Sequence, residues 1–208
     1  YHRKNLNLTI IGITGSNGKT TTTLLLGHIL KKAKYDVLIA GNIGESFASA
    51  ISKRDYNYVV LELSSFQLDG IKNFRSKISI ILNITPDHLD RYDNNFDKYK
   101  QSKYRITKNQ NKKDYLIYNI DDPALNKINT KAQKIPLSYS KEFPKGGILT
   151  NNKIKIKLNN KTMTIQELAL QGKHNAFNSM AAAIAARVFE VKDTVIRQSM
   201  IDFQNVEH

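Results

Sequence analysis

The stretch Ile10-Ile11-Gly12-Ile13-Thr14-Gly15-Ser16-Asn17-Gly18-Lys19-Thr20-Thr21-Thr22 decides the fold of this 208-residue chain. The apolar run 8–13 that leads into it predicts a buried parallel strand, and the leucine-rich run 24–30 after it predicts a helix. A strand, a glycine-rich turn, a Lys-Thr pair and a helix in this order are typical of a phosphate-binding loop. The alternative, a turn of small residues that happens to precede a lysine, leaves this order unexplained.

The residue types in the turn suit phosphate chemistry. Two glycines let the backbone curl so that successive N–H groups point at one anion, and the helix N-terminus adds partial positive charge. Lys19 can reach the β- and γ-phosphates, and the Thr20 hydroxyl can hold Mg²⁺. The turn is shorter than the common G-x-x-x-x-G-K-[ST] pattern, whose first glycine would fall at Ile13. The residues expected to hold the nucleotide phosphates are Gly15, Ser16, Asn17, Gly18, Lys19, Thr20 and Thr21.

Composition narrows the class of protein. Hydrophobic residues make up 40% of the chain, and no apolar run approaches the length of about 20 residues that a membrane span needs. The sequence does not show a charged start followed by an apolar block, the pattern that would indicate a signal peptide. The chain has no cysteine, which excludes disulfides and thiolate zinc sites and fits a reduced cytoplasm.

The net charge of +14 raises the hypothesis of a polyanionic partner such as nucleic acid. The basic residues are spread over the chain, however, and the joint abundance of Lys, Asn and Ile also fits a codon-level bias expressed on solvated faces. A nucleotide or an anionic substrate would gain from the same charge. We therefore do not expect nucleic-acid binding to be the main function.

Short apolar strands alternate with helices over the first two thirds of the chain. This order predicts an α/β fold with a P-loop-type doubly wound, mostly parallel sheet flanked by helices. Further strands are expected at 36–40, 58–63, 78–82, 115–118 and 134–137, and helices at 46–51, 96–108 and from Pro123. From Gly146 to about 166 the period changes to two, which predicts a small antiparallel β meander. Two more helices are expected, at 172–189 and at 193–203 with Asp193 as N-cap.

Polar clusters come directly after several of the expected strands, at 41–44, 62–69 and 83–92. In doubly wound sheets, ligands bind outside the carboxyl ends of the strands. We therefore expect these clusters to lie on one rim and to form one site with the glycine-rich turn.

Some of the polar residues expected near that rim have chemistry of their own. Glu62 stands where many P-loop proteins keep an acidic metal ligand, although an edge carboxylate without special role is the alternative. His88 is an unusual ligand for Mg²⁺, because Mg²⁺ prefers hard oxygen ligands. Binding of Mn²⁺ and acid–base chemistry are equally good interpretations of this histidine, and a structural role as a helix cap is a further alternative. Lys103 reads from the residues alone as a solvated position on a helix. Asn175 and Asn178, which follow His174, present amides on one side of a helix start or cap it.

Together these motifs resemble those of the Mur ligase family. The matching stretches are TGSNGKTT at 14–21, GNIG at 41–44, ELSSFQL at 62–68, NITPDHLDRY at 83–92, Lys103 and GKHNAFN at 172–178. The turn alone indicates only the wider family, which includes folylpolyglutamate synthase. The ELSSFQL stretch is what points to the member that adds D-glutamate.

The resemblance implies a ligase that uses ATP to join a carboxylate to an amine through an acyl phosphate. It implies catalytic roles for Lys19, Lys103 and His88. A first Mg²⁺ would lie at Thr20 and Glu62, and a second at His88 and a carbamylated Lys103, whose added oxygens make a metal there chemically reasonable. Asn42, Ser64 and Gln67 would contact the uridine-nucleotide substrate, and Asn175 and Asn178 would face the adenine.

The implied partners are UDP-N-acetylmuramoyl-L-alanine and D-glutamate, in cytoplasmic synthesis of peptidoglycan precursors without a membrane. We expect a linker at 1–7, the central ATPase domain at 8–205, and at 206–208 the start of a link to a further domain. Without the N- and C-terminal domains of such ligases, the chain is expected to bind nucleotide weakly and not to ligate. A folylpolyglutamate synthase-like ligase domain and, from another class, a nucleic-acid-binding P-loop protein are the alternatives.

Overall fold

A computed structural model describes residues 8–43, 46–87 and 89–204 and places all nine of their strands in one sheet, ordered β2-β3-β1-β4-β5-β6-β7-β8-β9. Strands β1 to β7 pair in parallel with one another, whereas β8 pairs antiparallel with both β7 and β9. The strands are β1 (Thr9–Thr14), β2 (Val37–Gly41), β3 (Tyr58–Glu62), β4 (Ile78–Ile81), β5 (Tyr115–Asn119), β6 (Gln133–Ser138), β7 (Gly146–Thr150), β8 (Lys153–Leu158) and β9 (Lys161–Ile165). The predicted α/β class and the antiparallel meander are confirmed, and the meander continues the parallel sheet through β7.

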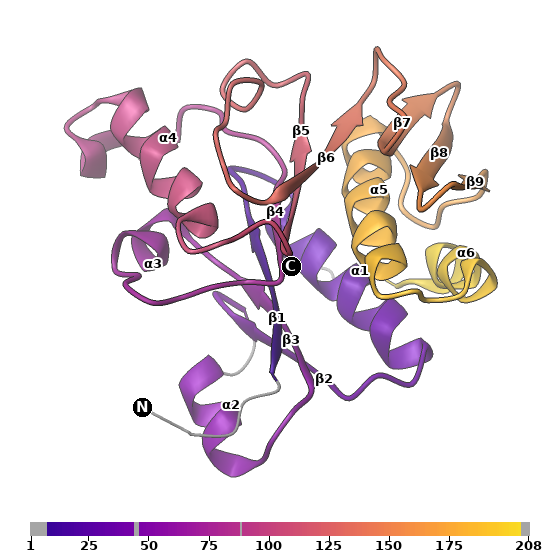
Figure 1. Ribbon diagram of the computed structural model, residues 1–208, viewed down its shortest axis with the longest axis horizontal. Coiled ribbons are helices and arrows are strands. Elements are labelled where there is room, and N and C mark those ends of the chain that lie inside the picture. The colour runs from indigo at the N-terminus through magenta and orange to yellow at the C-terminus, as the bar shows by residue number, and fades with distance from the viewer. Residues whose placement is uncertain (1–7, 44–45, 88, 205–208) are drawn as a thin grey trace.

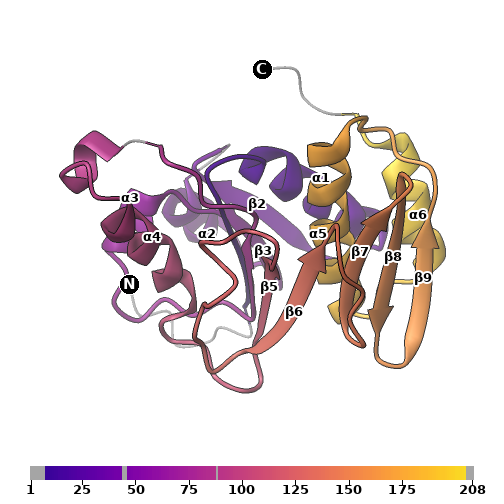
Figure 2. The ribbon, with the colours of Figure 1, turned by 90° about the horizontal axis from the view of Figure 1, so that it is seen from above.

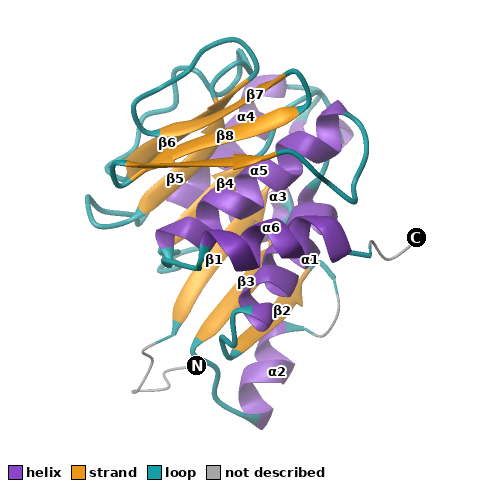
Figure 3. Cartoon of the chain, turned by 90° about the vertical axis from the view of Figure 1, so that its right-hand side faces the viewer, coloured by secondary structure: helices purple, strands orange, loops and turns teal. Residues whose placement is uncertain are grey.

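Helices cover the sheet in two groups (Figures 1 and 3). On one face lie α1 (Lys19–Lys32), α5 (Lys173–Val188) and α6 (Asp193–Asp202), and Figure 2 shows α5 and α6 beside β7 to β9. The other group is α2 (Phe47–Lys53), α3 (Ser65–Asp69) and α4 (Phe96–Tyr104), with the short 3-10 helices η1 (Leu89–Tyr92) and η2 (Arg105–Thr107). Each helix of the described ranges is too short or too polar to traverse a bilayer.

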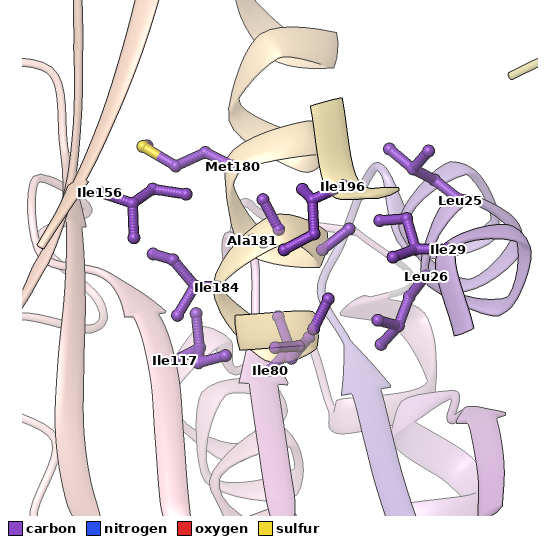
Figure 4. Packing of buried hydrophobic residues seen from close by; sticks show 14 of the residues in the cluster. Leu25, Leu26, Ile29, Ile80, Ile117, Ile156, Met180, Ala181, Ile184 and Ile196 are labelled. Atoms are coloured by element: carbon purple, nitrogen blue, oxygen red, sulfur yellow. The ribbon is translucent and has the colours of Figure 1, made fainter. Parts of the chain in front are cut away.

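The larger core lies between α1, α5, α6 and the sheet. Helix α5 passes through its middle, with Ala181 towards α1 and Met180 and Ile184 towards the strands (Figure 4). Its run of fully buried alanines keeps the helix thin, so that neighbours on both sides approach closely. Glycine serves the same purpose in β7, because a Cβ on Gly147 would lie 2.7 Å from the Met180 sulfur. The labelled members of this core are Leu25, Leu26, Ile29, Ile80, Ile117, Ile156, Met180, Ala181, Ile184 and Ile196.

Three local expectations are corrected by the structure, which also adds one helix. Helix α4 ends at Tyr104 and tightens into η2 instead of running to 108. The chain after Pro123 forms turns and not a helix. Lys192 is the N-cap of α6, and Asp193 is its first residue, where its carboxylate pairs with Arg187 at 3.3 Å. Helix α3 was not expected, because its five residues are too few to show helical periodicity.

Candidate nucleotide-binding site

The glycine-rich turn leaves β1 at the carboxyl edge of the sheet and enters α1. Gly18 is the N-cap of α1 and has φ of 83°, a left-handed conformation that favours glycine. Gly15 lies close to the end of β4, and a Cβ there would make a tight contact of 3.2 Å with Leu82 Cβ. The N–H groups of the first helical turn have no partner within the helix, so they face the space in front of the turn. This arrangement can hold an anion.

Two lysines converge on the backbone of this turn. Lys19 Nζ donates to the carbonyl oxygens of Gly15, at 3.0 Å, and Ser16, at 2.8 Å. Lys103 Nζ donates to the same Gly15 oxygen at 2.9 Å. Both amines therefore stand at the position where phosphate charge would arrive, and a phosphate can replace the carbonyls as their partner.

Lys103 is 2% exposed, so its expected place on a solvated helix face is wrong. Its amine lies 4.7 Å from the ring centre of Tyr99, which is buried on the same helix. Burial, and secondarily repulsion from Lys19, lowers the pKa of Lys103 to about 7. A large fraction of this amine is therefore neutral near physiological pH.

Glu62 and Thr20 meet at the end of β3. The Thr20 hydroxyl donates to Glu62 Oε2 at 2.9 Å, and Asn42 Nδ2 donates to Glu62 Oε1 at 3.3 Å. The carboxylate is 1% exposed and carries hard oxygens, the ligand type that Mg²⁺ and Mn²⁺ take. The residues that the sequence assigned to a first metal are thus brought together.

Only one of the two residues expected to bind a second metal ion lies among the described residues. His88 lies outside the described residues, so its catalytic and metal roles remain predictions. No group of three His, Asp or Glu side chains with metal-binding geometry occurs within the described ranges. Lys103, the other member of the expected set, lies at the turn.

Ser64 and Gln67, the expected substrate contacts, form a capping box at the start of α3. Ser64 Oγ accepts from the Gln67 N–H at 3.3 Å, and Gln67 Oε1 accepts from the Ser64 N–H at 2.8 Å. The spacing S-x-x-Q carries this signal in the sequence. The amide nitrogen of Gln67 stays available for a ligand, because the box uses only its oxygen.

Two residues to which the sequence reasoning gave no role hold the turn in place, and a third holds the segment after β4. Asn83 accepts the Asn17 N–H on its side-chain oxygen at 2.8 Å and returns a bond to the Asn17 carbonyl at 3.0 Å. The Tyr99 hydroxyl lies 3.0 Å from Ser16 Oγ, which also donates to the Thr85 carbonyl at 2.9 Å. The third is Asp122, which accepts the Ile84 N–H at 2.8 Å. The position of Asn83 directly after a strand was the available signal.

A cavity of about 790 Å³ opens beside the turn. The Asn178 side chain closes against the turn, since a Cβ on Gly18 would lie 2.4 Å from Asn178 Oδ1. Asn175 donates its amide to the Gln171 carbonyl at 2.9 Å, which leaves its oxygen as an acceptor. His174 also lines the cavity. The other lining residues are Asn17, Gly18, Thr21, Leu82, Asn83, Ile84, Thr85, Pro86, Phe96, Asn119, Asp122, Pro123, Ala124, Tyr139 and Phe177.

Apart from His88 and the Ser64–Gln67 capping box, the sequence-predicted residues fall into two adjoining groups on the carboxyl rim. The turn, Lys103, Thr20, Glu62 and Asn42 form one hydrogen-bonded group. Asn175 and Asn178 lie on the cavity beside it. The expectation of one shared rim is confirmed, because β1 to β4 run parallel and end on the same edge.

A parallel sheet with a lysine-bearing glycine turn at its carboxyl edge and a cavity beside it defines a P-loop-type nucleotide-binding domain. The model of the Mur ligase middle domain matches residues 13–186. This chain belongs to the Mur ligase family.

Curated relatives agree with this assignment. The chain is 48% identical over 205 residues to the UDP-N-acetylmuramoylalanine–D-glutamate ligase of Christiangramia forsetii, covering 96% of this chain and 46% of that protein. It is 44% identical over 207 residues to the protein of the same name from Porphyromonas gingivalis, with the same coverage. The chain spans about half the length of the curated relatives it matches.

Solved structures share the fold at low sequence identity. A pseudomurein peptide ligase type C from Methanothermus fervidus superposes with a TM-score of 0.75 and 22% identity, over 99% of this chain and 51% of that one. The MurF ligase from Thermotoga maritima in complex with ADP superposes with a TM-score of 0.70 and 18% identity, over 95% of this chain and 49% of that one. At these identities the likeness supports the fold alone.

Proposed function

We propose that this chain is the ATP-binding middle domain of an ADP-forming ligase that adds D-glutamate to UDP-N-acetylmuramoyl-L-alanine. The observation that carries the proposal is the 48% identity to a relative named for that reaction. The structure supports it through the phosphate-binding turn, the two lysines at Gly15 and the adjoining cavity. The site suits a cytoplasmic step of peptidoglycan precursor synthesis.

Lys19 and the turn would bind the ATP phosphates. The Lys19 amine can leave the Gly15 and Ser16 carbonyls and follow the negative charge that builds up on the transferring phosphoryl group. Asn175 keeps a free acceptor oxygen, which suits the amine at position 6 of adenine and disfavours the carbonyl of guanine.

Thr20 and Glu62 would hold a first Mg²⁺, with Mn²⁺ as an alternative. Their oxygens are 2.9 Å apart and lie beside the turn, which fits a hard divalent ion. Bound there, the ion would offset phosphate charge. A second ion would use His88 and Lys103 as the resemblance implies.

Lys103 is proposed to carry a carbamate. Its amine is buried and its pKa lies at about 7, so the neutral form that adds CO₂ is well populated. The neutral amine adds CO₂ and releases one proton to solvent, which leaves a carbamate anion beside Lys19. This change removes the repulsion between the two amines and supplies oxygen ligands.

The proposed reaction has two balanced steps. A carboxylate oxygen of the nucleotide substrate attacks the γ-phosphorus of ATP, the bond to the bridging oxygen breaks, and ADP leaves. The D-glutamate amine then attacks the acyl carbon of the acyl phosphate, loses a proton and expels phosphate. Lys19 stabilises the phosphoryl oxygens in the first step. Asn42, Ser64 and Gln67 are proposed to orient the nucleotide substrate at the end of β3.

The test is phosphate release by the full-length protein that carries this domain. ATP, UDP-N-acetylmuramoyl-L-alanine and D-glutamate together should give release that depends on all three and that Lys19→Ala abolishes. A folate and L-glutamate serve as the competing substrate pair. Activity with the folate pair alone would refute the D-glutamate assignment, and RNA or DNA binding indifferent to Lys19→Ala would favour a nucleic-acid-binding protein.

A further inference from the structure

Ser16 lies on the phosphate turn but has no hydrogen-bond donor left for a phosphate. Its hydroxyl carries one hydrogen and can accept two hydrogen bonds. The hydrogen goes to the Thr85 carbonyl at 2.9 Å, and the oxygen accepts the Thr85 N–H at 3.0 Å. The backbone N–H of Ser16 is used as well, because it donates to the Asn83 carbonyl at 3.0 Å. The phosphate oxygens of a nucleotide need donors, and Ser16 gives all of its donors to the protein.

Tyr99 fills the remaining position on the Ser16 hydroxyl. The two oxygens are 3.0 Å apart, and the only hydrogen of Ser16 already goes to Thr85, so the Tyr99 hydroxyl is the donor. Tyr99 is 1% exposed and Ser16 is 6% exposed, which shields this bond from water. We call Ser16, Thr85 and Tyr99 the clasp.

The clasp joins three parts of the chain. Ser16 lies on the turn after β1, Thr85 follows β4 at a distance of 69 residues, and Tyr99 lies on α4. Residues four apart lie on the same side of a helix, so Tyr99 and Lys103 face the turn together. The Lys103 amine accordingly donates to the Gly15 carbonyl at 2.9 Å, directly beside the residue that Tyr99 holds. The clasp therefore sets how α4 and the segment after β4 sit on the turn.

The segment that the clasp holds at Thr85 carries a carboxylate close to Lys103. Asp87 lies two residues after Thr85, and the ring of Pro86 between them fixes its own φ, so the position of Thr85 is passed on to Asp87. The negative charge of Asp87 raises the pKa of Lys103 against the larger lowering by burial, so the two groups lie within electrostatic reach. A shift of Thr85 would move this charge relative to Lys103 and to phosphates on the turn.

We propose that Ser16 acts through its side chain as the centre of the clasp and not as a phosphate ligand, and that Tyr99 is a positioning residue for phosphoryl transfer. This inference rests on the proposed function, because it assumes transfer of a phosphoryl group from ATP. Catalysis of such a transfer is almost entirely positioning and electrostatic stabilisation, so a loosened clasp slows the chemical step. Nucleotide binding changes little, since Asn83 holds the turn independently through two bonds to Asn17.

The test compares the chemical step with ATP affinity in the full-length protein that carries this domain. Tyr99→Phe removes the hydroxyl and keeps the ring beside Lys103. It should lower the single-turnover rate of substrate-dependent phosphate release on the order of 10-fold, the amount that one hydrogen bond contributes, and leave the Kd of ATP with Mg²⁺ within about twofold. Ser16→Ala should act in the same direction. The double variant should lose no more than Ser16→Ala alone, because the bond to Tyr99 is already absent there.

Tyr35→Phe is the matched control. It also removes a tyrosine hydroxyl that donates a hydrogen bond, to the Phe189 carbonyl at 2.7 Å, and Tyr35 is not among the residues that line the cavity. Both the rate and the Kd should stay at the wild-type values. A rate in Tyr35→Phe as low as that in Tyr99→Phe would overturn the proposal, because it would mean that the loss reflects general destabilisation.

Two further outcomes would also overturn the proposal. ATP affinity that falls as much as the rate in Ser16→Ala would make Ser16 a phosphate ligand or a merely structural residue. An unchanged rate in Tyr99→Phe would mean that the clasp positions nothing, and this variant decides alone if Ser16→Ala does not fold. Either result in an active enzyme leaves the proposed function intact. If the wild-type protein releases no phosphate with its substrates, the proposed function itself fails, and the role of the clasp fails with it.

Discussion

Replacing the buried Lys103 by methionine should change how the stability of the domain depends on pH. The amine is 2% exposed and its pKa falls from 10.5 to about 7 on folding, mainly through burial. Between these two values the unfolded chain holds the proton and the folded chain does not. Because the unfolded state binds more protons there, wild-type stability rises with pH across that window, and the burial penalty is fully present below pH 7.

The size of the effect is set by the same two pKa values. A difference of one pKa unit corresponds to about 1.4 kcal/mol. Lys103 should therefore lower the free energy of unfolding by about 5 kcal/mol below pH 7, and about 3 kcal/mol of this should return between about pH 7 and pH 9.5. Lys103→Met has no proton to bind, so its stability should lack this rise and exceed that of the wild type at about pH 6.

The measurement is urea unfolding of both chains at a series of pH values from about 6 to 9.5, in buffers freed of CO₂ so that no carbamate forms. The quantity of interest is the difference in the free energy of unfolding between the two chains at each pH. Lys98→Met, on the exposed side of the same helix, is the control and should follow the wild type. Parallel pH profiles for wild type and Lys103→Met would refute the reasoning, because they would mean that the amine is solvated or paired.

Three further changes test the site. Gly18→Ala should lower the free energy of unfolding by about 1–2 kcal/mol through the left-handed backbone, and by more because the new Cβ meets Asn178. The control is Gly70→Ala, where φ is −81° and the nearest atom to a Cβ lies at an ordinary 3.7 Å; it should leave thermal unfolding nearly unchanged. Glu62→Gln keeps the shape but loses the charge, so the gain in ATP affinity on adding Mg²⁺ should shrink roughly tenfold; an unchanged gain would place the ion elsewhere. Ser64→Ala should destabilise the domain by about 1 kcal/mol through the lost cap, and a larger loss of substrate affinity than of stability would support a second, substrate-binding role.

Much of the fold could be predicted because its signals are local. Each of these signals is contained in a short stretch of sequence, so it can be recognised without knowledge of the rest of the chain. They are the apolar runs of β1 to β6, the period-two pattern of the meander, and the glycine-rich turn with its lysine. The common rim is a consequence of the topology of parallel strands. Short elements escaped the prediction, as α3 shows, although the S-x-x-Q spacing of its capping box was present.

The sequence by itself determined a phosphate-binding turn on a parallel sheet and the residue types around it. Only the tertiary structure decided that Lys103, 88 residues away from Gly15, is buried against the turn. The same is true of Tyr139 and Phe177, which meet because the end of β6 and the start of α5 lie at one place. The physical reason is that a polar helix such as α4 has no hydrophobic stripe to reveal its buried side. Which face it turns inward depends on packing against the whole sheet, and this packing also sets the charge state of the amine.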